Sequence, residues 1–131
     1  MLNLPNTTST LEVVTGAAVV SISVHASFVD YAYTALPPTV TPSWQNTLIV
    51  LAVTTTVVLA PTSPNVDRNI KFLSINNASA TPCAVTVQYF DGAAHRPLFG
   101  PVTLGAAWSL HYTTDGAGFV VYDNMGRIQE A

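Results

Sequence analysis

Charged side chains are scarce in this sequence. Asp, Glu, Lys and Arg make up 8% of its 131 residues, against about 25% in an average globular protein. Only four residues are basic and the net charge is −3. Because so few cations cannot neutralise a run of phosphates, nucleic acid is not an expected partner. The stretch 47–60, TLIVLAVTTTVVLA, holds no charged residue at all.

The sequence also lacks the features of a disulfide-bonded, exported or membrane-spanning protein. A single cysteine, Cys83, excludes an internal disulfide and is expected to be a small buried side chain. The first ten residues, MLNLPNTTST, lack the basic segment and apolar core of a signal peptide. The most apolar window, 47–61, is shorter than the ~20 residues of a spanning helix and is interrupted by three threonines. We therefore expect no signal peptide and no membrane insertion.

What the sequence does contain is apolar residues at every second position. Val85, Val87 and Tyr89, for example, alternate with small or polar neighbours, which places each set on one face of a sheet. No segment of ten or more residues has helical periodicity. The sequence therefore predicts an all-β fold, an antiparallel β-sandwich or a jelly-roll-like small barrel of eight to nine strands.

Turn-forming clusters divide the predicted strands. NNASATP at 76–82, DG at 91–92 and TDGAG at 114–118 mark turns, and such signals recur roughly every 8 to 12 residues, as in sandwiches and small barrels. The predicted strands cover 10–15, 18–25, 47–53, 55–60, 69–76, 83–90, 98–104, 107–113 and 118–123.

The length fits one domain, 1–131. Residues 61–131 are predicted to form the compact core. Residues 1–60 are predicted to supply N-terminal strands and a proline-rich loop, part of which contacts neighbours. That loop, ALPPTVTPS at 35–43, holds three of the nine prolines and is interpreted as a linker or long loop, since proline does not fit a central strand.

Catalytic or metal-binding motifs are not found. Asp91 and Asp115 precede glycines, where aspartate favours turns. His25 lies five residues before Asp30, which would place both at one strand end, but two ligands are too few for a structural metal site. No zinc, nucleophile-elbow or phosphate-loop motif appears. We expect no enzyme activity, no cofactor and no metal; the rival hypothesis is a polysaccharide-degrading enzyme whose Asp30 and Asp67 converge in a cleft.

The aromatic residues divide into core and contact candidates. Tyr89, Trp108 and Tyr112 share strand faces with aliphatic residues and are predicted to pack in the core. Trp44 follows the proline-rich loop, and His25 occupies the polar face of a strand. The residues expected to contact another subunit or a glycan are Trp44, Thr54, Thr55, Thr56 and His25.

The uncharged stretch 47–60 also bears on assembly. Monomeric proteins protect sheet edges with charges, bulges or cover, and an exposed uncharged strand invites aggregation. Closure within the fold or burial against another subunit would solve this, and hydroxyl-rich strands can be buried without desolvating charges. We expect a homo-oligomer, a trimer or ring.

Two long segments carry a resemblance to a known family. RNIKFLSINNASATPCAVTVQYFDG and VTLGAAWSLHYTTDGAGFVVYDNMGRI are similar to small virion proteins of tailed bacteriophages. That family shows R-x-I/V-K-x-L-x-I/V-x-N, a V-T-V strand ending in D-G, then V-T-L-x-A-G-E-x-L-x-Y, D-G-x-G-F and G-R-I. LEVVTGAAVVSISVHASFVDY resembles its N-terminal part.

The resemblance implies a structural component of the virion, made in the host cytoplasm, that binds itself and other virion proteins. A tail, baseplate or fibre location is slightly favoured. Decoration of the capsid as a cement protein is the alternative, and a carbohydrate-binding module for host adhesion, with Trp44 at its glycan contact, is a rival from another class.

Overall fold

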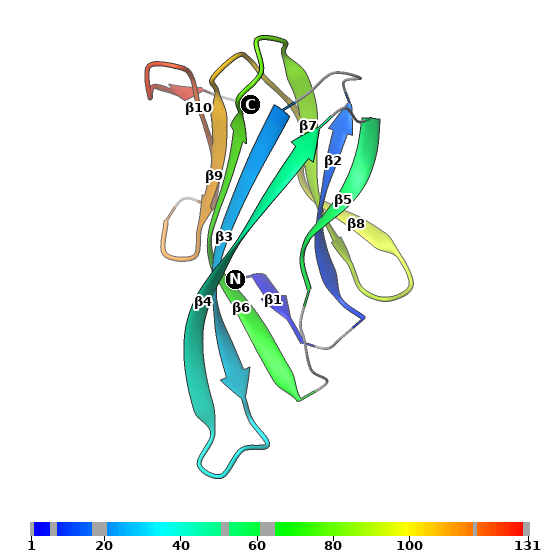
Figure 1. Ribbon diagram of the computed structural model, residues 1–131, viewed down its shortest axis with the longest axis vertical. Helices are drawn as coiled ribbons and strands as arrows, with labels where there is room; N and C mark the ends of the chain where they lie inside the picture. Colours follow the sequence, from blue (N-terminus) through cyan, green and yellow to red (C-terminus); the bar gives the residue numbers. More distant parts are fainter. Residues whose placement is uncertain are drawn as a thin grey trace.

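The fold is a sandwich of two β-sheets (Figure 1). The computed structural model describes residues 2–5, 8–16, 21–50, 53–60, 65–116 and 118–129, and these ranges contain eleven strands and no helix. The strands are β1 (Leu2–Leu4), β2 (Thr10–Gly16), β3 (Ser21–Ala32), β4 (Thr39–Val50), β5 (Val53–Leu59), β6 (Val66–Asn77), β7 (Cys83–Phe90), β8 (His95–Leu104), β9 (Ser109–Thr113), β10 (Gly118–Tyr122) and β11 (Ile128–Gln129). The predicted all-β sandwich is confirmed.

Both sheets are antiparallel. The larger has the order β11-β10-β9-β6-β3-β4, and the smaller has the order β5-β2-β7-β8. In the larger sheet, β6 pairs with β3 along one edge. Its other edge is shared by β1, opposite residues 68–70, and β9, opposite residues 72–76. In Figure 1, β1 lies beside the lower part of β6 and β9 beside its upper part. The first strand of the chain thus fills a place that β9 leaves open.

Several strands differ from the sequence prediction in number or length. Eleven are present instead of eight or nine, because β1 and β11 are too short to show a period. Residues 39–43, predicted as loop, belong to β4. Pro42 is compatible with β4 because β4 is the edge of its sheet, where a backbone nitrogen that faces outward has no neighbouring strand to bond. Positions 18–20 and 51–52 of the predicted strands lie outside the described residues.

The core is built from both halves of the chain. Of the buried hydrophobic residues, as many precede residue 61, such as Leu11 and Ile22, as follow it. Residues 61–131, predicted as the compact core, supply half of these side chains, and β2 and β3 from the first half of the chain are interior strands of the two sheets. The burial of Cys83 and Tyr112 is confirmed, and Trp108 packs half-buried against the same core.

A buried asparagine closes one end of the sandwich. Asn77 is fully buried, and its amide nitrogen donates to the carbonyls of Thr81, Leu104 and Gly105 at 2.9, 2.9 and 3.2 Å. Its amide oxygen accepts from the backbone and the hydroxyl of Ser79. One side chain therefore joins the end of β6 to the loop before β7 and to the end of β8.

A buried arginine ties the two sheets together elsewhere along β6. Arg68 on β6 forms a two-pronged ion pair with Asp30 on β3, both contacts being 2.8 Å. It also donates to the carbonyl of Ala60, just after β5, at 2.7 Å. The guanidinium lies 3.9 Å from the ring centroid of Phe28. Because the charge is paired and hydrogen-bonded, its burial does not leave an isolated ion in the interior.

Candidate interaction surfaces

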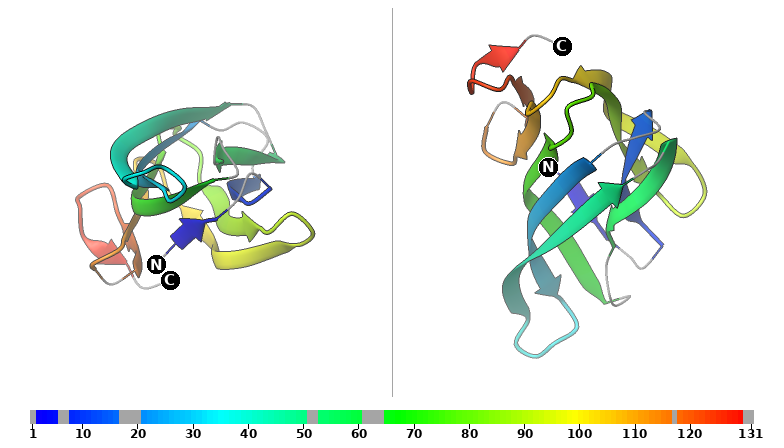
Figure 2. Two further views of the ribbon diagram at one scale, coloured as in Figure 1. Left: turned by 90° about the horizontal axis from the view of Figure 1, so that it is seen from below. Right: turned by 45° about the horizontal axis from the view of Figure 1, so that its top comes forward.

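One side of the sandwich consists of two uncharged edge strands. β4 ends the larger sheet and β5 ends the smaller one, and both lie on the same side of the molecule (Figure 2, left). Residues 31–66 include no Asp, Glu, Lys or Arg, so neither strand carries a charge. We call this side, formed by β4 and β5, the open flank. The uncharged stretch 47–60 thus contains the end of β4 and the whole of β5.

The opposite edges are protected. β8 carries Arg96, is interrupted by Pro97 and Pro101, and pairs with β7 through two register shifts, all features that discourage pairing with another chain. β11 has only two residues and lies beside the Asp123–Arg127 ion pair of 2.8 Å. Among the described strands, β4 and β5 present the long uncharged edges.

Four of the five contact residues predicted from the sequence lie on the open flank, and the fifth, His25, lies on the neighbouring strand β3. Thr55 is exposed and Thr56 half-buried on β5, whose Thr54 pairs with Thr15 of β2. Trp44 lies on β4, not after a loop, and is 65% exposed. Its ring stacks on His25 of β3 at a centroid distance of 6.2 Å. The structure therefore brings Trp44 and His25 together and leaves the threonines on the other sheet.

Trp44 and His25 begin a row of rings across the outer face of the larger sheet, the face turned away from the core. His25 approaches Phe72 at 6.4 Å, Phe72 approaches His111 at 5.5 Å, and His111 approaches Tyr122 at 5.0 Å. The row crosses β4, β3, β6, β9 and β10. Burial among these rings lowers the pKa of His111 below 6.5, because the charged imidazolium loses solvation.

Phe72 was not singled out from the sequence. Strict alternation would place it on the same face as Ile70, in the core. A β-bulge reverses this: Ser27 on β3 faces Phe72 and the next residue faces Ile70, so Lys71 is the extra residue. Thr114 stabilises the bulge by donating to the carbonyl of Ile70 at 2.9 Å.

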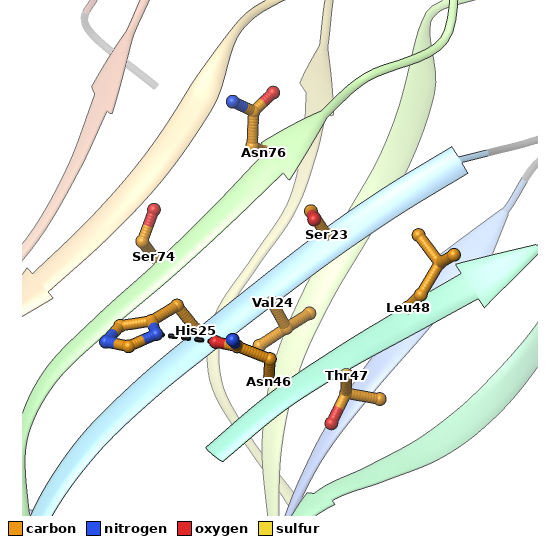
Figure 3. A pocket seen from close by; sticks show the side chains of 8 residues that line it. All are labelled: Ser23, Val24, His25, Asn46, Thr47, Leu48, Ser74 and Asn76. Atoms are coloured by element: carbon orange, nitrogen blue, oxygen red, sulfur yellow. Dashed lines mark hydrogen bonds between the residues drawn. The ribbon is translucent and has the colours of Figure 1, made fainter. Parts of the chain in front are cut away.

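A groove lies beside this row, over β3 and between β4 and β6 (Figure 3). Its volume is about 510 Å³, and its lining includes Ser23, His25, Asn46, Leu48, Ser74 and Asn76. We call it the outer-face groove. The Nδ1 atom of His25 lies 2.6 Å from the amide oxygen of Asn46, which fixes both side chains. The lining is uncharged apart from the titratable imidazole.

Asp30 and Asp67, the two carboxylates of the rival enzyme hypothesis, do not converge in a cleft. Asp30 faces the core side of β3 and forms an ion pair with Arg68. Asp67 lies opposite Tyr31 of β3, on the outer face of the sheet. His25 and Asp30, five residues apart on β3, point to opposite faces and not to one strand end. No three His, Cys, Asp or Glu residues within the described ranges gather where a metal could bind.

Another polar cluster lies on the smaller sheet. The nearly buried carboxylate of Glu12 on β2 accepts a hydrogen bond from Gln88 of β7 at 2.9 Å and lies 2.7 Å from Nδ1 of His95 on β8. Each of the three side chains is within hydrogen-bond distance of the other two, across the adjacent strands β2, β7 and β8. The cluster can therefore hold the three strands in register.

Comparison of the chain with known protein families, curated proteins and solved structures gives no match. In the part of the chain that the structure describes, no helix is long and apolar enough to span a membrane.

Proposed function

We propose that this chain is a non-enzymatic structural protein of a tailed-bacteriophage particle that assembles with itself through the open flank. It contacts other virion proteins from the remaining surface. A place in the tail, baseplate or fibre is slightly favoured over decoration of the capsid, which remains the alternative.

The observation that carries the self-assembly is the open flank. Unpaired N–H and C=O groups along β4 and β5 are suited to pairing with a strand of another chain. Exposed Thr55 and Val57, the latter 49% exposed, would then be covered without removing any charge from water. Burial of these strands is less costly than burial of the edge that carries Arg96.

The virion part of the proposal depends on the sequence resemblance, and the motif residues have structural roles compatible with it. Arg68 and Asn77, the first and last residues of the R-x-I-K-x-L-x-I-x-N motif, connect the sheets as described above. Gly92, Gly118 and Gly126 of the remaining motifs have φ of +95°, +80° and +78°, a region that glycine adopts without strain. These motifs therefore specify a fold and not an activity.

Self-assembly is tested by placing a charge on the open flank. The unmodified protein should elute as a multiple of the chain mass in size-exclusion chromatography with light scattering. Thr55→Lys should shift it toward the monomer, because an edge lysine opposes strand pairing. Thr103→Lys makes the same change at an exposed position of β8, the opposite edge of the same sheet, and should leave the mass unchanged. A monomeric unmodified protein at every concentration would contradict the proposal.

The location is tested on purified particles. Electron microscopy of the virion should place the chain at the tail, with tens of copies, or on the head, with hundreds. Absence of the chain from particle proteomics would overturn the virion assignment while leaving the self-assembly result intact.

A further inference from the structure

We infer that the outer-face groove is a binding site for a neutral saccharide. The inference is separate from the open flank. Strand pairing uses backbone groups at the edge of β4, in the plane of the sheet, whereas the groove opens on the face of that sheet. A chain paired through the flank therefore keeps the groove accessible.

The size and the polar lining of the groove fit such a ligand. Its volume of about 510 Å³ falls within the range of roughly 300–1,000 Å³ usual for small-molecule sites. Within the described ranges, the side chains of Ser23, Ser74 and Asn76 form no hydrogen bond to the protein. Together they supply hydroxyl and amide groups that both donate and accept, as the hydroxyls of a sugar require.

His25 and Asn46 add a fixed pair to this lining. An amide oxygen only accepts, so the hydrogen between them lies on Nδ1 of His25 (Figure 3). The amide nitrogen of Asn46 then keeps both hydrogens free for a ligand. The other ring nitrogen of His25 lies 3.2 Å from the hydroxyl of Ser27, which holds the imidazole plane in place. Donors positioned in advance lose less entropy on binding.

Trp44 provides an apolar surface next to these polar groups. It lies two residues from Asn46 on the same face of β4, and it is 65% exposed although its ring stacks on His25. A pyranose has a C–H face that covers an aromatic ring and a rim of hydroxyls that bond to amides and hydroxyls. Leu48, 63% exposed at the other end of the groove, extends the apolar surface.

The charge of the groove selects among ligand classes. Its lining has no Lys or Arg, which phosphate and sulfate recognition would require. It has no carboxylate for a cationic ligand. A fully apolar ligand would leave the polar groups unpaired, at a cost for each one buried. A neutral, hydroxyl-rich molecule satisfies all three conditions.

The test is titration with defined sugars. Probes are neutral oligosaccharides of glucose, galactose, mannose and N-acetylglucosamine, with sialyl-lactose and a heparin fragment as charged comparators. Binding is measured by calorimetry and by shifts of the Asn46 and Asn76 side-chain amides in NMR spectra. We expect at least one neutral probe to bind, to move both amide signals, and to bind more tightly than the charged comparators.

Variants assign the binding to the groove. Asn46→Ala and Asn76→Ala should each weaken it roughly tenfold, the effect of one lost hydrogen bond. Trp44→Ala should weaken it at least as much, and Trp44→Phe should retain most of it. Asn69→Ala changes the same residue type on the same face of β6 outside the groove and should have no effect. Both groove asparagines are exposed, so these variants should fold.

Two results would overturn the inference: no neutral probe binds, or binding is unchanged in both asparagine variants. Stronger binding of the charged comparators would do the same. Thr55→Lys separates this site from the proposed assembly, since that variant should bind the sugar as tightly as the unmodified protein whether or not it has become monomeric.

Discussion

At the scale of single residues, this protein depends on a few buried polar groups because it has so few charges. Asn77 satisfies three backbone carbonyls at the end of the sandwich, and Arg68 satisfies a carbonyl and a carboxylate elsewhere on the same strand. Apolar periodicity cannot reveal such roles, because an asparagine inside a turn cluster looks like a turn residue. NNASATP predicted the turn correctly and gave no sign that its second asparagine is buried.

The two adjacent asparagines give a direct measurement of this role. Asn77→Ala should lower the free energy of unfolding by about 3 kcal/mol or more, because several buried groups lose their partners. Asn76→Ala, at an exposed position on the same strand, should change it by less than about 0.5 kcal/mol. Urea denaturation at one fixed protein concentration measures both. If Asn77→Ala lowered the free energy of unfolding as little as Asn76→Ala, the buried amide would be dispensable for stability.

Acid stability depends on another turn residue. The pKa of Asp91 is lowered from 3.8 to about 2 by hydrogen bonds from the Ala94 backbone, the Arg96 side chain and the Ala93 backbone. A depressed carboxyl pKa stabilises the fold above pH 3.8, and this stabilisation is lost as the pH falls to about 2. The unmodified protein should therefore be more stable than Asp91→Asn near neutral pH, and the difference should shrink between about pH 4 and pH 2.

A pH series of denaturation curves for both proteins tests this. The lowered pKa of His111 makes both less stable as the pH falls below about 6.5, since the unfolded chain binds the proton more readily, and this effect cancels in the difference. Asp115→Asn is the control: Asp115 is an exposed turn aspartate whose side chain forms no hydrogen bond to the described residues. A difference that stays constant down to about pH 2 would contradict the role of Asp91.

At the scale of elements, the sequence predicted nine strands near their observed positions because period-two alternation and turn clusters are local signals. It failed where the structure depends on tertiary pairing. β4 begins at residue 39 despite Pro42 because it is an edge strand. The bulge at Lys71 turns Phe72 outward, so the row of rings could not be found from strict alternation. Trp44 and His25 are the members of that row that were predicted from the sequence as contact residues.

The short strand β1 shows how much an element without periodicity can contribute. Leu4 is 1% exposed, and the backbone N–H of Leu2 donates to the hydroxyl of Tyr112 at 3.1 Å. Leu4→Ala should lower the free energy of unfolding by about 3 kcal/mol, the usual cost of truncating a buried leucine. Asn3→Ala, on the exposed side of β1, should cost less than about 0.5 kcal/mol. Thermal and urea unfolding would detect the contrast, and a silent Leu4→Ala would mean that β1 detaches in solution.

At the scale of the whole molecule, scarcity of charge was the signal that pointed to assembly, and the structure concentrates the uncharged strands on one side. The sequence located the uncharged stretch at 47–60. It could not show that this stretch forms edge strands of two different sheets, or that the opposite edge strands β8 and β11 are protected. The position of a strand at an edge is decided by the pairing of strands distant in the sequence.

The open flank, as the one side suited to strand pairing, limits the size of the assembly. Trimers and rings have heterologous interfaces, in which one patch of each chain binds a different patch of the next chain. With the far edges blocked by proline, bulges and short length, the open flank is the one such patch among the described strands, and a single patch can match only its own copy across a twofold axis. We therefore expect polymerisation to terminate at the pair, in place of the trimer or ring anticipated from the sequence. Any larger architecture would have to be supplied by other proteins.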